Sequence, residues 1–149
     1  MINQNLIAPC GLYCGVCGIH VATKNGDEQL KEKLAKAYGD TPDKINCQGC
    51  LSSSVYWYCR VCSVKSCVLE KGYAGCHQCE SFPCDKIDNF PVPEGKRNIL
   101  RAIPLWRKLG TEEFIRAEEK LFSCVNCGTG LFRGARKCRR CGTLVAPAY

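Results

Sequence analysis

The chain has 149 residues, of which 15 are cysteine, and its formal net charge at pH 7 is +7. This cysteine content is typical of a small protein that relies on metal ions or cross-links because its apolar core is limited. No apolar run approaches the roughly 18 residues of a membrane-spanning helix, and the N-terminus lacks the features of a secretory signal. We therefore expect a cytoplasmic protein. In that reducing compartment, closely spaced cysteines are expected to be metal ligands or redox centres, and not disulfides.

Helical patterning first occurs in three short segments of the N-terminal part, at residues 14–24, 27–38 and 63–71. In the second segment, Leu30 and Leu34 recur at the spacing of one helical face, and charged residues occupy the other face. These patterns predict short helices, each packing by one face against the cysteine-rich loops around it.

The same N-terminal part contains eleven cysteines, which form three CxxC pairs, one C-x3-C-x2-C triplet and two single cysteines. They are Cys10, Cys14, Cys17, Cys47, Cys50, Cys59, Cys62, Cys67, Cys76, Cys79 and Cys84. Eleven thiolates are enough for about two closed four-ligand sites and one three-cysteine site. The spacing does not determine which of these cysteines share an ion.

The triplet of Cys10, Cys14 and Cys17 leaves several interpretations open. His20 lies three residues further on and is a possible fourth ligand. Radical S-adenosylmethionine enzymes hold an iron–sulfur cluster at this spacing, but the chain is too short and too rich in cysteine to provide their barrel. No segment matches the cysteine run of a ferredoxin, so a cluster held by non-sequential cysteines remains the iron–sulfur alternative.

A bridge at residues 93–122 is predicted to contain two further helices. The segment 98–109 is apolar on one side, and Pro104 is expected to kink or interrupt it. Thr111 is a suitable N-cap for the next helix, which has acidic residues in its first turn. Their apolar stripes indicate core packing against the N-terminal module.

Two CxxC pairs follow in residues 123–149, separated by ten residues. Their cysteines are Cys124, Cys127, Cys138 and Cys141. Pairs at this spacing are typical of a zinc ribbon, in which two turns present four thiolates to one tetrahedral ion. We therefore expect a C-terminal zinc ribbon of β-hairpins with a closed, structural site, although an all-thiolate site also accepts iron.

The C-terminal part is also basic, because residues 121–149 contain five basic and no acidic side chains. The five are Arg133, Arg136, Lys137, Arg139 and Arg140. They could contact the phosphates of a nucleic acid, or they could offset the negative charge of four thiolates. Phe132 is the only aromatic residue between the cysteine pairs, so base stacking has little support and the second interpretation is favoured.

The sequence APCGLYCGVC, continued by CQGC, CRVC, CHQC and ESFPC, resembles a prokaryotic family of cysteine-rich proteins catalogued as a domain of unknown function. The resemblance covers residues 6 to 90 and extends to the segment GTEEF at 110–114, and the C-terminal pairs look like an extension carried by some members. It implies zinc binding at the eleven N-terminal cysteines and brings no catalytic residues.

Together these features predict a small α+β fold: a mostly helical cysteine-rich module at residues 1–92, a helical bridge at 93–122 and a zinc ribbon at 123–149. The predicted function is binding of about three or four Zn²⁺ ions that hold a scaffold for recognition of a partner, for example a protein. The alternatives are an iron–sulfur redox or electron-transfer protein and a nucleic-acid-binding ribbon. No nucleophile–base constellation indicates an enzyme, and no membrane association is expected.

Overall fold

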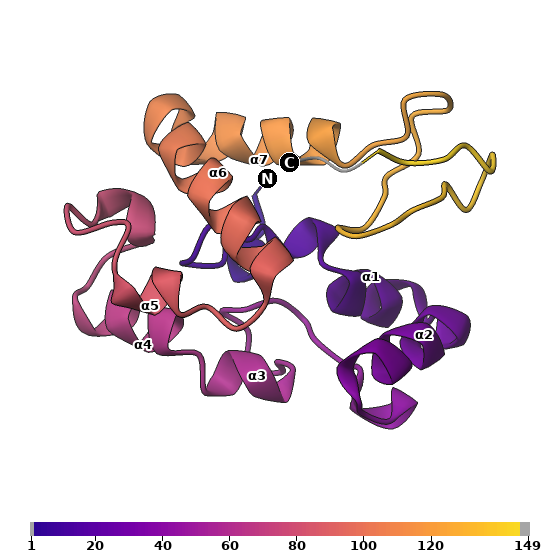
Figure 1. Ribbon diagram of the computed structural model, residues 1–149, viewed down its shortest axis with the longest axis horizontal. Coiled ribbons are helices and arrows are strands. Elements are labelled where there is room, and N and C mark those ends of the chain that lie inside the picture. Colours follow the sequence, from indigo (N-terminus) through magenta and orange to yellow (C-terminus); the bar gives the residue numbers. More distant parts are fainter. Residues whose placement is uncertain (1, 147–149) are drawn as a thin grey trace.

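The computed structural model describes residues 2–146 and shows a small helical protein (Figure 1). Its α-helices are α1 Gly18–Asn25, α2 Glu28–Tyr38, α3 Trp57–Arg60, α4 Ser63–Glu70, α5 Asp85–Asp88, α6 Pro93–Leu109 and α7 Thr111–Leu121. Its 3-10 helices are η1 Gln4–Leu6, η2 Cys14–Val16, η3 Pro42–Lys44 and η4 Cys76–Gln78. No helix in this range is long and apolar enough to cross a membrane.

Helices α1 and α2 form the hairpin at the lower right of Figure 1. Helix α2 begins where the Asp27 side chain accepts a hydrogen bond of 3.0 Å from the backbone N–H of Leu30, which satisfies one of the unpaired donors of the first turn. It ends at Gly39, whose φ of 68° is accessible to glycine at little cost. Helix α1 begins at Gly18, later than predicted, because Cys17 has extended backbone angles that separate α1 from η2.

Helix α6 is longer than predicted and runs through Pro104 without interruption. Its inner face contains Ile99, Ile103 and Trp106, all of which are almost completely buried. Pro104 and Leu100 lie on the exposed face, so the carbonyl that a proline leaves without a partner is on the solvent side. Burial of the inner face therefore maintains the helix despite the lost hydrogen bond.

The larger group of buried apolar side chains lies between the α6–α7 pair and the N-terminal loops, and it includes Ile7 and Val16. Within it, the rings of Trp106 and Phe114 stack with their centroids 5.3 Å apart. A smaller group lies around α1 and α2 and includes the fully buried Ile45. Several cysteines belong to these groups, so thiols and aliphatic side chains share the interior.

A buried ion pair connects α6 to α7. The Arg101 guanidinium donates hydrogen bonds of 2.7 and 2.9 Å to the two carboxylate oxygens of Glu118. Glu118 is only 1% exposed, so this carboxylate depends on Arg101 to replace the water that it loses on folding. The bidentate contact fixes the relative position of the two helices.

The prediction of an α+β fold with a C-terminal zinc ribbon of β-hairpins is wrong. Residues 2–146 contain no β-strand, and the C-terminal part has only two isolated bridges, Ser123 with Gly130 and Lys137 with Leu144. Pairing does not continue past the first bridge, because the chain then turns to the N-terminal module, where the backbone N–H of Arg133 donates to the Val16 carbonyl over 2.6 Å. Docking on the helices thus replaces extension of a hairpin.

Candidate metal centre

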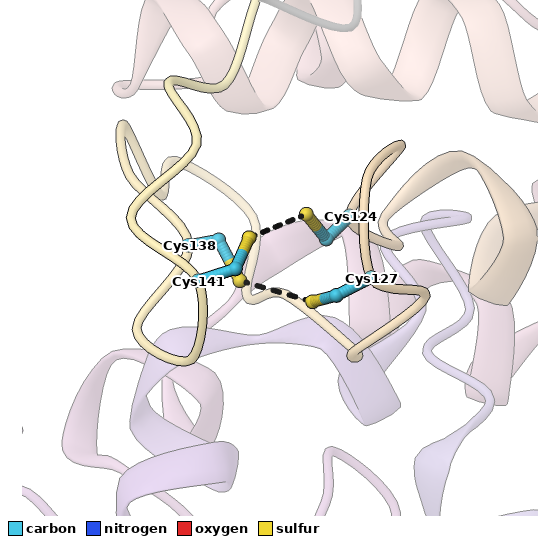
Figure 2. A group of neighbouring side chains, drawn as sticks. All are labelled: Cys124, Cys127, Cys138 and Cys141. Carbon is cyan, nitrogen blue, oxygen red and sulfur yellow. Dashed lines mark hydrogen bonds between the residues drawn. The ribbon is translucent and has the colours of Figure 1, made fainter.

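The four C-terminal cysteines converge on one point, although they come from two separate turns (Figure 2). The sulfurs of Cys124, Cys127, Cys138 and Cys141 all lie within 4.8 Å of one another. Two of the Sγ–Sγ distances are 3.6 Å, between Cys124 and Cys141, and 3.7 Å, between Cys127 and Cys138. Four sulfurs about 2.3 Å from a tetrahedral Zn²⁺ would be separated by about 3.8 Å, so this arrangement fits such an ion.

The two turns share one backbone design. In each turn the N–H of the following glycine donates to the carbonyl of the first cysteine over 2.9 Å: Gly128 to Cys124, and Gly142 to Cys138. The two glycines have φ values of 75° and 76°, a region that other residues adopt only with strain. Glycine after each CxxC pair is therefore what allows the turn to close around the sulfurs.

A threonine follows each of these glycines and contacts the second sulfur of its pair. The side chains of Thr129 and Cys127 are hydrogen bonded at 3.2 Å, and those of Thr143 and Cys141 at 3.1 Å. The contact with Thr143 lowers the pKa of Cys141 to about 5, because a hydrogen bond to the thiolate favours the charged form. The repeat of Cys-Gly-Thr in both turns was the sequence signal for these threonines, and the prediction missed it.

The C-terminal turns are attached to the helical module by two of the five basic residues. The Arg133 guanidinium donates to the Tyr13 carbonyl over 2.8 Å and lies over the Phe122 ring. Arg139 forms an ion pair with Asp27, the N-cap of α2. Docking therefore engages these two cations, although Arg139 stays exposed, as do Arg136, Lys137 and Arg140.

Several N-terminal cysteines surround the loop that follows η3. The Cys14 sulfur accepts a hydrogen bond from the backbone N–H of Cys50, and the Cys47 sulfur accepts one from Gly49, both over 3.4 Å. Contact with the Cys50 thiol lowers the pKa of Cys59 to about 7. Burial, followed by the charge of the neighbouring Cys17, raises the pKa of Cys14, so these thiols repel one another as thiolates in the absence of a cation.

Gly49 gives this loop its close approach to the N-terminus. Its φ is 115°, and a Cβ at this position would lie 2.3 Å from the backbone oxygen of Asn5. A side chain at position 49 would therefore push apart two backbone segments that pack directly against each other.

A further set of N-terminal cysteines lies around η4. Burial raises the pKa of Cys76 to about 12, with smaller contributions from Cys84, Cys79, Cys67 and other thiols. Burial also raises the pKa of Cys10 to about 12. In the described part of the chain, only the C-terminal group has three or more candidate ligand atoms within 4.8 Å of one another, so the eleven N-terminal sulfurs, the triplet included, are not drawn together to that extent.

The two histidines make other contacts. The Nδ1 atom of the buried His20 lies 3.0 Å from the Cys47 carbonyl oxygen, and because a carbonyl only accepts, this nitrogen carries the proton. The His77 ring stacks on Trp106 with 3.7 Å between the centroids. His20 is thus fixed against the Cys47 backbone by one of its two ring nitrogens.

Comparison with known proteins finds no match among curated proteins and none among solved structures. A family described as "Protein of unknown function (DUF3795)" matches residues 6–89, and this range includes all eleven N-terminal cysteines but none of the C-terminal four. The resemblance in the order of the cysteine groups is therefore confirmed, and with more than half of its length matched, the chain belongs to this family of cysteine-rich proteins of unknown function.

Proposed function

We propose that the protein binds Zn²⁺ and that its metal sites hold a scaffold for recognition of a partner, with the C-terminal four cysteines forming one closed, structural site. The observation that carries this proposal is the convergence of Cys124, Cys127, Cys138 and Cys141 to within 4.8 Å. Zinc is proposed because it accepts four thiolates in a tetrahedron and, in structural sites, leaves no position open.

A metal ion explains this convergence better than disulfide bonds do. All fifteen cysteines are free, and two of the C-terminal sulfur pairs, at 3.6 and 3.7 Å, are well beyond the roughly 2.05 Å of a disulfide. The pairs also cross between the two turns, so the sulfurs surround one central position. Four thiolates at this separation repel one another, and a divalent cation at the centre removes that repulsion.

The structural role follows from what else holds the C-terminal segment. Val125 is 95% exposed and Leu144 is 80% exposed, and the segment has isolated bridges in place of strands. It therefore has little apolar burial to offset its conformational entropy, and metal binding would supply that free energy directly.

The experiment is metal analysis of the full chain purified anaerobically. A colourless protein that contains zinc, and that loses about one ion when Cys138 and Cys141 are both replaced by serine, is the expected result. A metal-free, disulfide-bonded protein would contradict the proposal. A brown protein with iron and acid-labile sulfide would replace zinc by the iron–sulfur alternative.

A further inference from the structure

A small cavity of about 110 Å³ lies beside α4, η4 and the beginning of α5. Four cysteines line it: Cys67, Cys76, Cys79 and Cys84. Cys67 comes from α4, Cys76 begins η4, Cys79 is the C-cap of η4, and Cys84 is the N-cap of α5. Four thiols from three short elements thus share one cavity.

The backbone around this cavity is held by contacts that do not involve sulfur. The Arg107 side chain donates hydrogen bonds of 2.8 Å to the His77 carbonyl and 2.6 Å to the Cys79 carbonyl. The N–H of Cys76 donates to the Pro9 carbonyl over 2.8 Å. The CxxC turn is therefore fixed in place from α6 and from the N-terminal loop, as expected for a preorganised ligand pair.

Two lysines line the same cavity, Lys71 and Lys86. The Lys71 ammonium lies 3.8 Å from the Cys79 sulfur. An ammonium gains little from a neutral thiol, whereas a zinc ion with four thiolates carries a net charge of about −2 that nearby cations offset. The lysines therefore favour thiolates around a metal ion over thiols that merely fill space.

We infer that Cys67, Cys76, Cys79 and Cys84 form a second closed site for a thiophilic divalent cation such as Zn²⁺, separate from the C-terminal centre. Its four sulfurs are further apart than the C-terminal four, since in the described part of the chain they do not all lie within 4.8 Å of one another. A tetrahedral ion requires sulfurs about 3.8 Å apart, so binding would draw the cysteine side chains further into the cavity. Cys67, Cys79 and Cys84 are partly exposed, so an ion reaches the site without unfolding of the module.

The rival interpretation is a packing gap lined by cysteines that act as small apolar residues. It predicts that removing two sulfurs changes no metal content. The two interpretations therefore differ in the number of ions that the folded chain binds.

The test counts zinc by native mass spectrometry on the full chain, on three cysteine variants and on one control variant, all prepared anaerobically. The double variant C76S/C79S is expected to lose about one ion, C138S/C141S about one other ion, and the combined variant both. Ser81→Ala is the matched control, because Ser81 lines the same cavity without being a soft ligand, and it keeps the full count. If C76S/C79S binds as many zinc ions as the wild type, the inference is overturned, whatever C138S/C141S shows. If C76S/C79S loses an ion and C138S/C141S loses none, the second site is supported and the proposed C-terminal site is contradicted.

A second variant keeps the test decisive if the serine variant fails to fold. Cys79→His replaces a sulfur ligand by a nitrogen ligand, so the Co²⁺-loaded variant is expected to keep its number of bound ions. Its absorption bands should move to shorter wavelength, and its sulfur-to-metal charge-transfer band should weaken. A Co²⁺ spectrum identical to that of the wild type overturns the inference. Lys71→Met is expected to weaken binding of one ion by roughly tenfold, without a change in stoichiometry at saturation.

Discussion

The two CxxC turns of the C-terminal segment, residues 123–146, face each other with four sulfurs within 4.8 Å. In the family module, residues 6–89, the eleven sulfurs are distributed among short helices and two groups of buried apolar side chains. The C-terminal segment exposes its large apolar residues Val125 and Leu144. Similar CxxC turns can therefore serve either as the main support of a segment or as one part of a packed interior.

The largest expected effect is loss of C-terminal order when its centre is removed. Cys138 is 1% exposed, and Cys138→Ser would remove one of the four proposed ligands. Much of the free energy of the proposed metal binding, on the order of 10 kcal/mol for structural zinc, would then be lost. Limited proteolysis should then cleave within residues 123–146 while far-UV circular dichroism retains the helical signal of the body.

Val125→Ala is the control for that variant, because Val125 lies inside the first turn and is 95% exposed. It should leave the cleavage pattern unchanged. Loss of the helical signal in Cys138→Ser would show instead that the C-terminal segment and the helical body fold as one cooperative unit.

The second effect is in the helical body, where stability should depend on packing and charge rather than on the C-terminal centre. Arg101→Met leaves the buried Glu118 carboxylate without its ion-pair partner and should lower the free energy of unfolding by about 3–5 kcal/mol. Urea denaturation monitored by circular dichroism would measure it. The control Arg116→Ala removes exposed pairs with Glu112 and Glu113 and should cost less than about 1 kcal/mol.

The third prediction concerns backbone packing in the family module. Gly49→Ala combines a φ of 115° with a Cβ only 2.3 Å from the Asn5 oxygen, so it should destabilise the module by about 2–3 kcal/mol. Gly72→Ala is the matched control, since Gly72 has a φ of 70° but no atom within 4 Å of the added Cβ. A similar loss of stability in both variants would mean that the conformation alone, and not the close approach, matters.

The fourth prediction is a pH dependence of the C-terminal centre. The pKa of Cys141 is about 5, below that of an ordinary thiol, because Thr143 hydrogen bonds to the sulfur. Because the Cys141 pKa is lower in the folded than in the unfolded chain, the Cys141 thiolate stabilises the folded state. This stabilisation is complete above the ordinary thiol pKa and is lost as the pH falls through about 5.

Thr143→Val should therefore raise the pH at which zinc is released and weaken zinc binding by roughly tenfold. Release can be followed with a chromogenic chelator during acid titration. Thr129→Val tests the equivalent contact with Cys127 and should move the release in the same direction. An unchanged release profile in both variants would show that the threonines do not tune the centre.

The smallest expected effect concerns nucleic acid. Arg133 and Arg139 contact the helical module, and Arg136, Lys137 and Arg140 are the exposed basic residues of the C-terminal part that take no part in these two contacts. We expect no salt-dependent binding of a random oligonucleotide in fluorescence anisotropy. Binding that weakens with salt, and that the triple glutamine variant abolishes, would instead favour the nucleic-acid alternative.

Much of the local structure could be predicted from the sequence. The face formed by Leu30 and Leu34, the Asp27 cap and the glycines that end α1, α2 and α6 are local features, and α2 begins at Glu28, directly after that cap. The C-terminal group of four cysteines could also be predicted, because two CxxC turns of fixed spacing bring their sulfurs close together. The continuity of α6 through Pro104 was not predictable, since it depends on burial of Ile99, Ile103 and Trp106 against distant segments.

Residues close in the chain specify the family, the helical character of the N-terminal part and the close cysteine pairs, so all three could be inferred from the sequence alone. Only the tertiary structure decided that the C-terminal turns dock on the helices through Arg133 and do not extend into hairpins. Only the tertiary structure, too, placed Cys67 and Cys84 in one cavity with the Cys76–Cys79 turn. The physical reason is the same in both cases: these arrangements are set by contacts between segments far apart in the chain, which spacing and periodicity do not encode.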